Sequence, residues 1–153
     1  MKLSRLFAAL SLAACASACA EDETLKDQLQ GGWVAVVGDD YARGWTFEGD
    51  GIERKDILLL DDGSLGMEIH TGRFTLQGNR LSWTWLSTSC EEYAIDDTVK
   101  VVVRGDTLQM TSLDGSWLLD RPEDVESDTP GVAFRFGCVH NDGTFEARSV
   151  KKL

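Results

Sequence analysis

Turn signals divide most of this chain into segments of strand length, and this feature limits its fold more than any other. From Trp33 onward, glycine stands beside aspartate or asparagine at Gly38-Asp39, Asp50-Gly51, Asp62-Gly63, Gly78-Asn79, Gly105-Asp106, Asp114-Gly115 and Asp142-Gly143. Such pairs are typical of tight hairpins, because their central residues adopt positive φ at little cost. The runs between them are short and rich in β-branched and aromatic residues. This spacing predicts antiparallel strands joined by hairpins.

Period-two alternation predicts which side chains face inward. The expected inward sets are Leu81, Trp83 and Trp85, then Leu108 and Met110, then Val132, Phe134, Phe136 and Cys138. Half-buried antiparallel strands produce this alternation, and about eight to ten segments of the chain fit it. An up-and-down meander that closes into a barrel removes its own sheet edges. We therefore predict an all-β barrel over residues 31–153, preceded by an acidic lead-in over residues 21–30.

Residues 1–20 have the order of a secretory signal: a basic start, a short apolar run and then small residues. The apolar run is too short to span a bilayer as a helix. Leu12-Ala13-Ala14-Cys15 resembles the bacterial lipobox and predicts a lipid on Cys15, with Cys19 as the alternative site. A cut within Ala18-Cys19-Ala20 would instead release a soluble periplasmic protein. Because no aspartate follows Cys15, we expect an outer-membrane lipoprotein that faces the periplasm.

Charge and cysteine content narrow the possible partners. The net charge of −11 becomes −13 when Lys2 and Arg5 leave with the signal. So acidic a surface repels phosphate backbones, and we expect no nucleic-acid partner. In an oxidising compartment, Cys90 and Cys138 are predicted to form a disulfide rather than a metal site, contributing about 3–4 kcal/mol to stability. We expect no metal, no cofactor and a monomer of about 135 residues.

An ordered series of short motifs suggests a family. Gly31 and Trp33 form a G-x-W signature, and Asp62-Gly63, Gly72-Arg73-Phe74 and Gly78-Asn79 follow it in order. This series resembles bacterial lipocalin-like lipoproteins. The resemblance implies a barrel with a short helical turn ahead of the signature, here over residues 25–30, and Trp33 packed across the closed bottom. The T-D-Y motif of animal lipocalins and a basic residue to stack on Trp33 are not recognisable in the sequence.

The aromatic residues are the candidate ligand contacts. Eight-stranded barrels can hold one small ligand in an apolar interior. Trp83 and Trp85 share a face with Leu81, and we predict that they bind a ligand together with Phe134 and Phe136. The alternative is that these rings only fill the core.

Catalytic signals are missing from the sequence, and no catalytic residue is expected. The G-x-S-x-G motif of serine hydrolases does not occur. We expect His70 to lie exposed at a strand end, and the adjacent Glu91 and Glu92 to point to opposite faces of a strand. The acidic turns at residues 48–51 and 61–63 lack the ligand spacing of an EF-hand.

These observations leave three hypotheses. The leading one is a lipid-anchored envelope protein whose barrel binds a small apolar ligand. The second is a protein inhibitor of a basic envelope hydrolase, which inserts the acidic segment from Arg121 to Gly131 into its target. The third is a structural envelope lipoprotein without a specific ligand.

Overall fold

The computed structural model describes residues 24–122 and 133–153, so the signal and lipidation sites predicted above lie outside the described residues. One short α-helix covers residues 24–29 and confirms the predicted helical turn. The strands are β1 (Gly31–Val37), β2 (Tyr41–Glu48), β3 (Gly51–Leu59), β4 (Leu65–Gln77), β5 (Arg80–Thr88), β6 (Asp97–Arg104), β7 (Thr107–Thr111), β8 (Ser116–Asp120), β9 (Phe134–Val139), β10 (Phe145–Ala147) and β11 (Lys151–Lys152). A 3₁₀ turn, Glu91–Tyr93, follows β5. Within the described ranges, no helix is long and apolar enough to cross a membrane.

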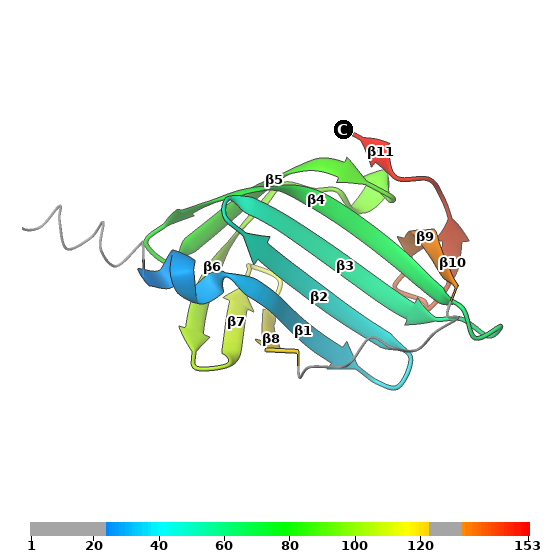
Figure 1. The fold of residues 1–153 in the computed structure, drawn as a ribbon, viewed down its shortest axis with the longest axis horizontal. Helices are drawn as coiled ribbons and strands as arrows, with labels where there is room; N and C mark the ends of the chain where they lie inside the picture. Colours follow the sequence, from blue (N-terminus) through cyan, green and yellow to red (C-terminus); the bar gives the residue numbers. More distant parts are fainter. Residues whose placement is uncertain (1–23, 123–132) are drawn as a thin grey trace, which may run out of the picture.

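The first eight strands form an antiparallel barrel in which each strand pairs with its neighbour in sequence and β8 closes on β1 (Figure 1). The glycine-containing turns predicted from the sequence explain why strands that are adjacent in sequence pair with each other. Gly78 and Gly105 begin two of the turns with φ of 60° and 58°, a region that side chains with a Cβ rarely adopt. The fold prediction is therefore confirmed, with eight strands in the barrel and three outside it.

The barrel is held together only loosely where its first and last strands meet. β1 pairs with β2 along all seven of its residues, from Gly31 to Val37. Its pairing with β8 on the other side consists of Val34 opposite Asp120. Residues 35–37 of β1 and residues 116–119 of β8 are not paired with each other, and we call this part of the wall the open seam.

β9 lies outside the barrel, and this corrects one prediction. It runs parallel to the first part of β4, with Leu65 opposite Phe134 and Met67 opposite Phe136. β4 and β5 pair farther along, and β10 covers the other side of β9. The two phenylalanines are therefore 55% and 43% exposed rather than directed inward. Alternation alone does not say which sheet a strand joins, which is why the prediction failed for β9.

The end of the barrel next to the helix is closed by Trp33, as the resemblance implied. Trp33 is 1% exposed, and its indole N–H donates to the carbonyl of Leu29 at 2.8 Å. The Arg121 guanidinium lies over the Trp33 ring at 3.7 Å and donates to the backbone carbonyls of Gln28 and Gln30. A basic residue therefore does stack on the signature tryptophan, contrary to the sequence interpretation.

Cys90 and Cys138 form the predicted disulfide. The bond joins the segment after β5 to β9 and fixes the β9–β10 hairpin against the barrel. Ser89 adds a hydrogen bond from its hydroxyl to the carbonyl of Gly137 at 2.7 Å. A buried disulfide of this kind is typical of proteins that fold in an oxidising compartment, which supports export.

Candidate functional site

A group of charged and polar side chains runs along the inner wall of the barrel, and we call it the polar ladder. It consists of Tyr41, Arg43, Arg54, Asp56, Glu68, His70 and Thr88. The strand register explains why these residues meet. Arg43 lies opposite Asp56, which lies opposite Glu68, and one step toward the closed end Arg54 lies opposite His70.

Within the polar ladder, basic and acidic side chains contact each other. Arg43 and Tyr41 both donate to Oδ1 of Asp56. Nε of Arg54 lies 3.1 Å from the other oxygen of Asp56 without hydrogen-bond geometry, and its Nη2 donates to Glu68 at 2.6 Å. Asp56 and Glu68 are 2% and 1% exposed. Carboxylates this deeply buried are tolerated only because cations and hydrogen bonds compensate them.

His70 is fully buried in the polar ladder, so the prediction of an exposed strand-end histidine is wrong. Its ring nitrogens lie 2.6 Å from Glu68 and 2.8 Å from the Thr88 hydroxyl. The strand does not end at His70, because β4 continues past a bulge at Thr71 and Gly72. The Gly72 backbone passes so close to Thr84 that an added Cβ would lie 2.2 Å from the carbonyl oxygen of Thr84.

Thr88, His70 and Glu68 have the order of hydroxyl, imidazole and carboxylate that nucleophilic enzymes use, but their setting is structural. All three are almost completely buried. The Thr88 hydroxyl also bonds the backbone of Cys90, and Glu68 accepts a hydrogen bond from the Val139 amide at 3.0 Å. None of the three lines either of the two cavities described below.

The polar ladder sets the ionisation of Tyr41. Burial, followed by repulsion from the nearby Asp56 carboxylate, raises the pKa of the Tyr41 hydroxyl well above its ordinary value. The phenol therefore remains a hydrogen-bond donor throughout the neutral range.

We expect the free energy of unfolding to fall as pH rises above about 10, because an unfolded tyrosine releases its proton there and a folded Tyr41 does not. Tyr41→Phe should remove part of this decrease and, by deleting a bond to a charged acceptor, lower stability at neutral pH by about 1.5–3 kcal/mol. Urea unfolding between neutral pH and pH 11 measures both effects. Tyr93→Phe is the control, because the Tyr93 hydroxyl bonds His140 rather than a carboxylate. Equal alkaline slopes in all three proteins would contradict the expectation.

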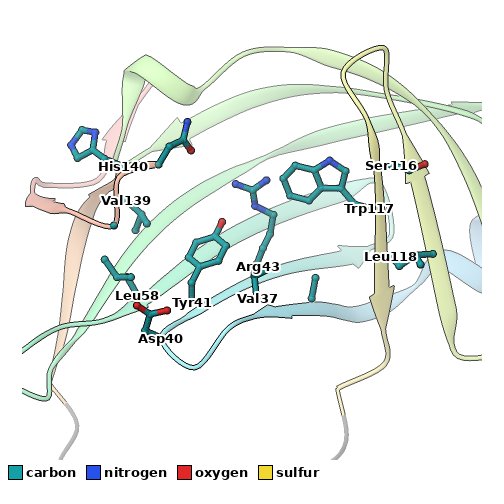
Figure 2. A pocket seen from close by; sticks show the side chains of 13 residues that line it. Val37, Asp40, Tyr41, Arg43, Leu58, Ser116, Trp117, Leu118, Val139 and His140 are labelled. Carbon is teal, nitrogen blue, oxygen red and sulfur yellow. The ribbon is translucent and has the colours of Figure 1, made fainter.

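An outer cavity of about 640 Å³ lies at the open seam. Figure 2 shows the Arg43 guanidinium beside the Trp117 ring at one edge of the cavity, with Tyr41, Leu58 and Val139 along the wall. Its lining comes from both sides of the seam and from the β9–β10 turn: Ala35, Val37, Asp40, Tyr41, Arg43, Leu58, Ser116, Trp117, Leu118, Val139, His140, Asn141 and Gly143. The wall combines aliphatic and aromatic side chains with a few polar groups, among which Arg43 supplies the one guanidinium, and such a mixture is found in small-molecule sites.

An inner cavity of about 280 Å³ lies deeper in the barrel. Arg43 and Trp117 line both cavities, with the guanidinium carbon 4.0 Å from the centre of the indole ring. The inner lining adds Trp45, Arg54, Trp83, Asp97, Val99, Met110, Ser112 and Asp114. The Arg43–Trp117 pair is thus the common wall of the two cavities.

The residues predicted as ligand contacts occupy different places. Trp83 lines the inner cavity. Trp85 is 4% exposed, donates to the carbonyl of Ile95 and packs against His70 in the core, away from both cavities. Phe134 and Phe136 lie on the outside. Sequence reasoning missed Arg43 and Trp117, although Arg43 shares the period-two face of Trp45 and Phe47 in β2.

Two further sequence interpretations can be placed in the structure. The sulfurs of Cys90 and Cys138 lie within 4.8 Å of a Glu92 carboxylate oxygen, but their bond to each other leaves no thiolate to bind a metal. Glu92 and its neighbour Glu91 lie in the 3₁₀ turn rather than in a strand. Arg121 belongs to the base of the barrel, and the rest of the acidic segment lies outside the described residues except for Pro122.

A comparison with solved structures finds a similar fold. The chain is similar to a lipocalin-like protein from Bacteroides uniformis ATCC 8492. The two share 18% sequence identity with a TM-score of 0.44, and the match covers 61% of this chain and 98% of the other. Neither a scan against family models nor a search of curated proteins gives a match. The lipocalin-like description of this chain rests on its own barrel topology, its closing helix and the Trp33–Arg121 stack.

Proposed function

We propose that this protein is a lipid-anchored envelope protein whose lipocalin-like barrel binds one small, largely apolar molecule in the outer cavity. The observation that carries the proposal is a cavity of about 640 Å³ whose wall combines aliphatic and aromatic side chains with the single guanidinium of Arg43 and a few other polar groups. Sites of this volume and composition typically hold metabolite-sized ligands. Export is supported by the signal-like order of residues 1–20 and by the disulfide. A lipid on Cys15 or Cys19 supplies the membrane attachment.

Filling the outer cavity is expected to abolish its binding capacity. Ala35 lines the cavity from β1, and a phenylalanine there would occupy the space next to Trp117. We expect the uncharged fluorophore N-phenyl-1-naphthylamine to bind the native protein with a rise in its emission. Ala35→Phe should weaken this binding at least about tenfold, which corresponds to about 1.4 kcal/mol.

Ala42→Phe is the matched control, because Ala42 belongs to the neighbouring strand and faces away from the barrel interior, opposite Val36 in the register. Both variants add the same side chain to the same hairpin. Circular dichroism and thermal unfolding show whether each is folded. Binding that is equally weakened in both variants, or unchanged in both, would contradict the outer cavity as the ligand site.

A further inference from the structure

Arg43 has unused hydrogen-bonding capacity at the place where the two cavities meet. Its Nε donates to Asp56, and its plane stacks on Trp117. Among the described residues, its two terminal nitrogens have no hydrogen-bond partner. Figure 2 shows them directed into the outer cavity. A guanidinium offers five N–H donors in a fixed plane, so most of this group's donors are available to a ligand.

The inner cavity adds more donors than acceptors. In the described part of the chain, the buried side-chain atoms without a hydrogen-bond partner are Trp45 Nε1, Trp83 Nε1, Arg54 Nε and Asp56 Oδ2. The three nitrogens are all donors from residues that line the inner cavity. The Asp56 oxygen and the Arg54 nitrogen lie 3.1 Å apart and engage each other electrostatically, which leaves the two indole N–H groups. Since buried polar groups normally have partners, the interior lacks acceptors rather than donors.

The charges around the cavities do not favour a charged ligand. Arg43 and Arg54 are already paired with Asp56 and Glu68, and Asp40, Asp97 and Asp114 also line the cavities. An added carboxylate or phosphate would therefore be an uncompensated buried charge, which is costly. The net charge of −11 also opposes the approach of an anion. A cation in the outer cavity would lie against the Arg43 guanidinium.

We propose that the ligand is an uncharged molecule with a hydrogen-bond acceptor, such as a carbonyl oxygen, bound to the terminal nitrogens of Arg43. The apolar body of the ligand lies against Trp117 and the aliphatic wall of the outer cavity. This inference rests on the proposed function and specifies the chemical class of the ligand. Arg43 determines the specificity, while Trp117 and the aliphatic side chains supply most of the contact area.

A matched set of naphthalenes tests the inference by displacement of N-phenyl-1-naphthylamine from the native protein. The set is 2-acetylnaphthalene, its isostere 2-isopropenylnaphthalene without the oxygen, 2-naphthoate and protonated 2-(aminomethyl)naphthalene. We expect the ketone to displace the probe at about one tenth of the concentration that the isostere needs, and the two charged compounds to be weaker than the ketone. A tenfold ratio corresponds to about 1.4 kcal/mol. Equal potency of ketone and isostere, or tighter binding of either charged compound, would overturn the inference.

Arg43→Met separates the role of the guanidinium from that of the cavity. The substitution keeps an unbranched apolar side chain and removes the donors, so the tenfold preference for the ketone should nearly vanish while the isostere still binds. Arg80→Met is the control, because Arg80 is exposed at the start of β5, and it should keep the preference. If Arg43→Met does not fold, the comparison of the four compounds on the native protein still decides the question. Failure of the probe itself to bind the native protein would refute the proposed function, and the inference with it.

Discussion

Replacing Glu68 with alanine is expected to lower the free energy of unfolding by about 3–5 kcal/mol, the range for breaking a buried ion pair from one side. Glu68 accepts hydrogen bonds from Arg54 and from the Val139 amide, and it lies 2.6 Å from His70. Its removal leaves a guanidinium and a backbone N–H buried without this acceptor. It also removes one of the links between the barrel and β9. Chemical denaturation at neutral pH measures the loss.

Glu53→Ala is the matched control for this substitution. Glu53 lies on β3, and its partner Lys55 is on the same strand, with side chains that are 29% and 39% exposed. An ion pair in that position contributes about 0–1 kcal/mol. Similar losses of unfolding free energy in both variants would show that burial does not determine how much the ion pairs of the polar ladder contribute to stability. A hydrophobic replacement of the whole ladder is a different experiment, because it leaves no unpaired charge behind.

Removing the disulfide is expected to weaken both stability and binding. Cys90 and Cys138 are separated by 48 residues, and closing a loop of that length constrains the unfolded chain by about 4 kcal/mol in the chain-entropy model. The double variant Cys90→Ala/Cys138→Ala should unfold at correspondingly lower urea concentration. It should also bind N-phenyl-1-naphthylamine less tightly, because Val139 and the turn after it form one wall of the outer cavity.

Reduction of the native protein provides an independent check on this expectation. Dithiothreitol should shift the native unfolding curve toward that of the double variant and leave the variant itself unchanged. If reduction changes neither the stability nor the probe binding of the native protein, the disulfide does not hold β9 and β10 in place as one wall of the outer cavity. Loss of stability without any loss of probe binding would show that the disulfide does not affect the ligand site.

The barrel could be predicted from the sequence because its signals are local. Glycine turns and the alternation in the segment around Trp83 depend only on neighbouring residues, and the structure confirms both. The disulfide followed from the small number of cysteines. The position of β9 depends on a parallel contact with β4, and nothing in its own alternation distinguishes an added strand from a barrel strand.

The polar ladder was not predicted because charge normally marks an outward face. In β3, the inward residues Arg54 and Asp56 alternate with the outward residues Glu53 and Lys55, so both faces of the strand look polar. Burial of His70 likewise depends on the bulge in β4 and on the clamp formed by β9. Arg121 was assigned to a loop because prolines and acidic residues follow it. In each case the structure is decided by a partner distant in sequence.

The open seam affects how this barrel can select between ligands of different size. A continuous wall would exclude any molecule longer than the cavity that it encloses. Here β1 and β8 are joined opposite Val34 and Asp120 and are unpaired on the side of the outer cavity. For the proposed ligand, we expect a long alkyl extension to leave sideways at the open seam, so that selection would depend on the end of the molecule held at Arg43 rather than on its overall size.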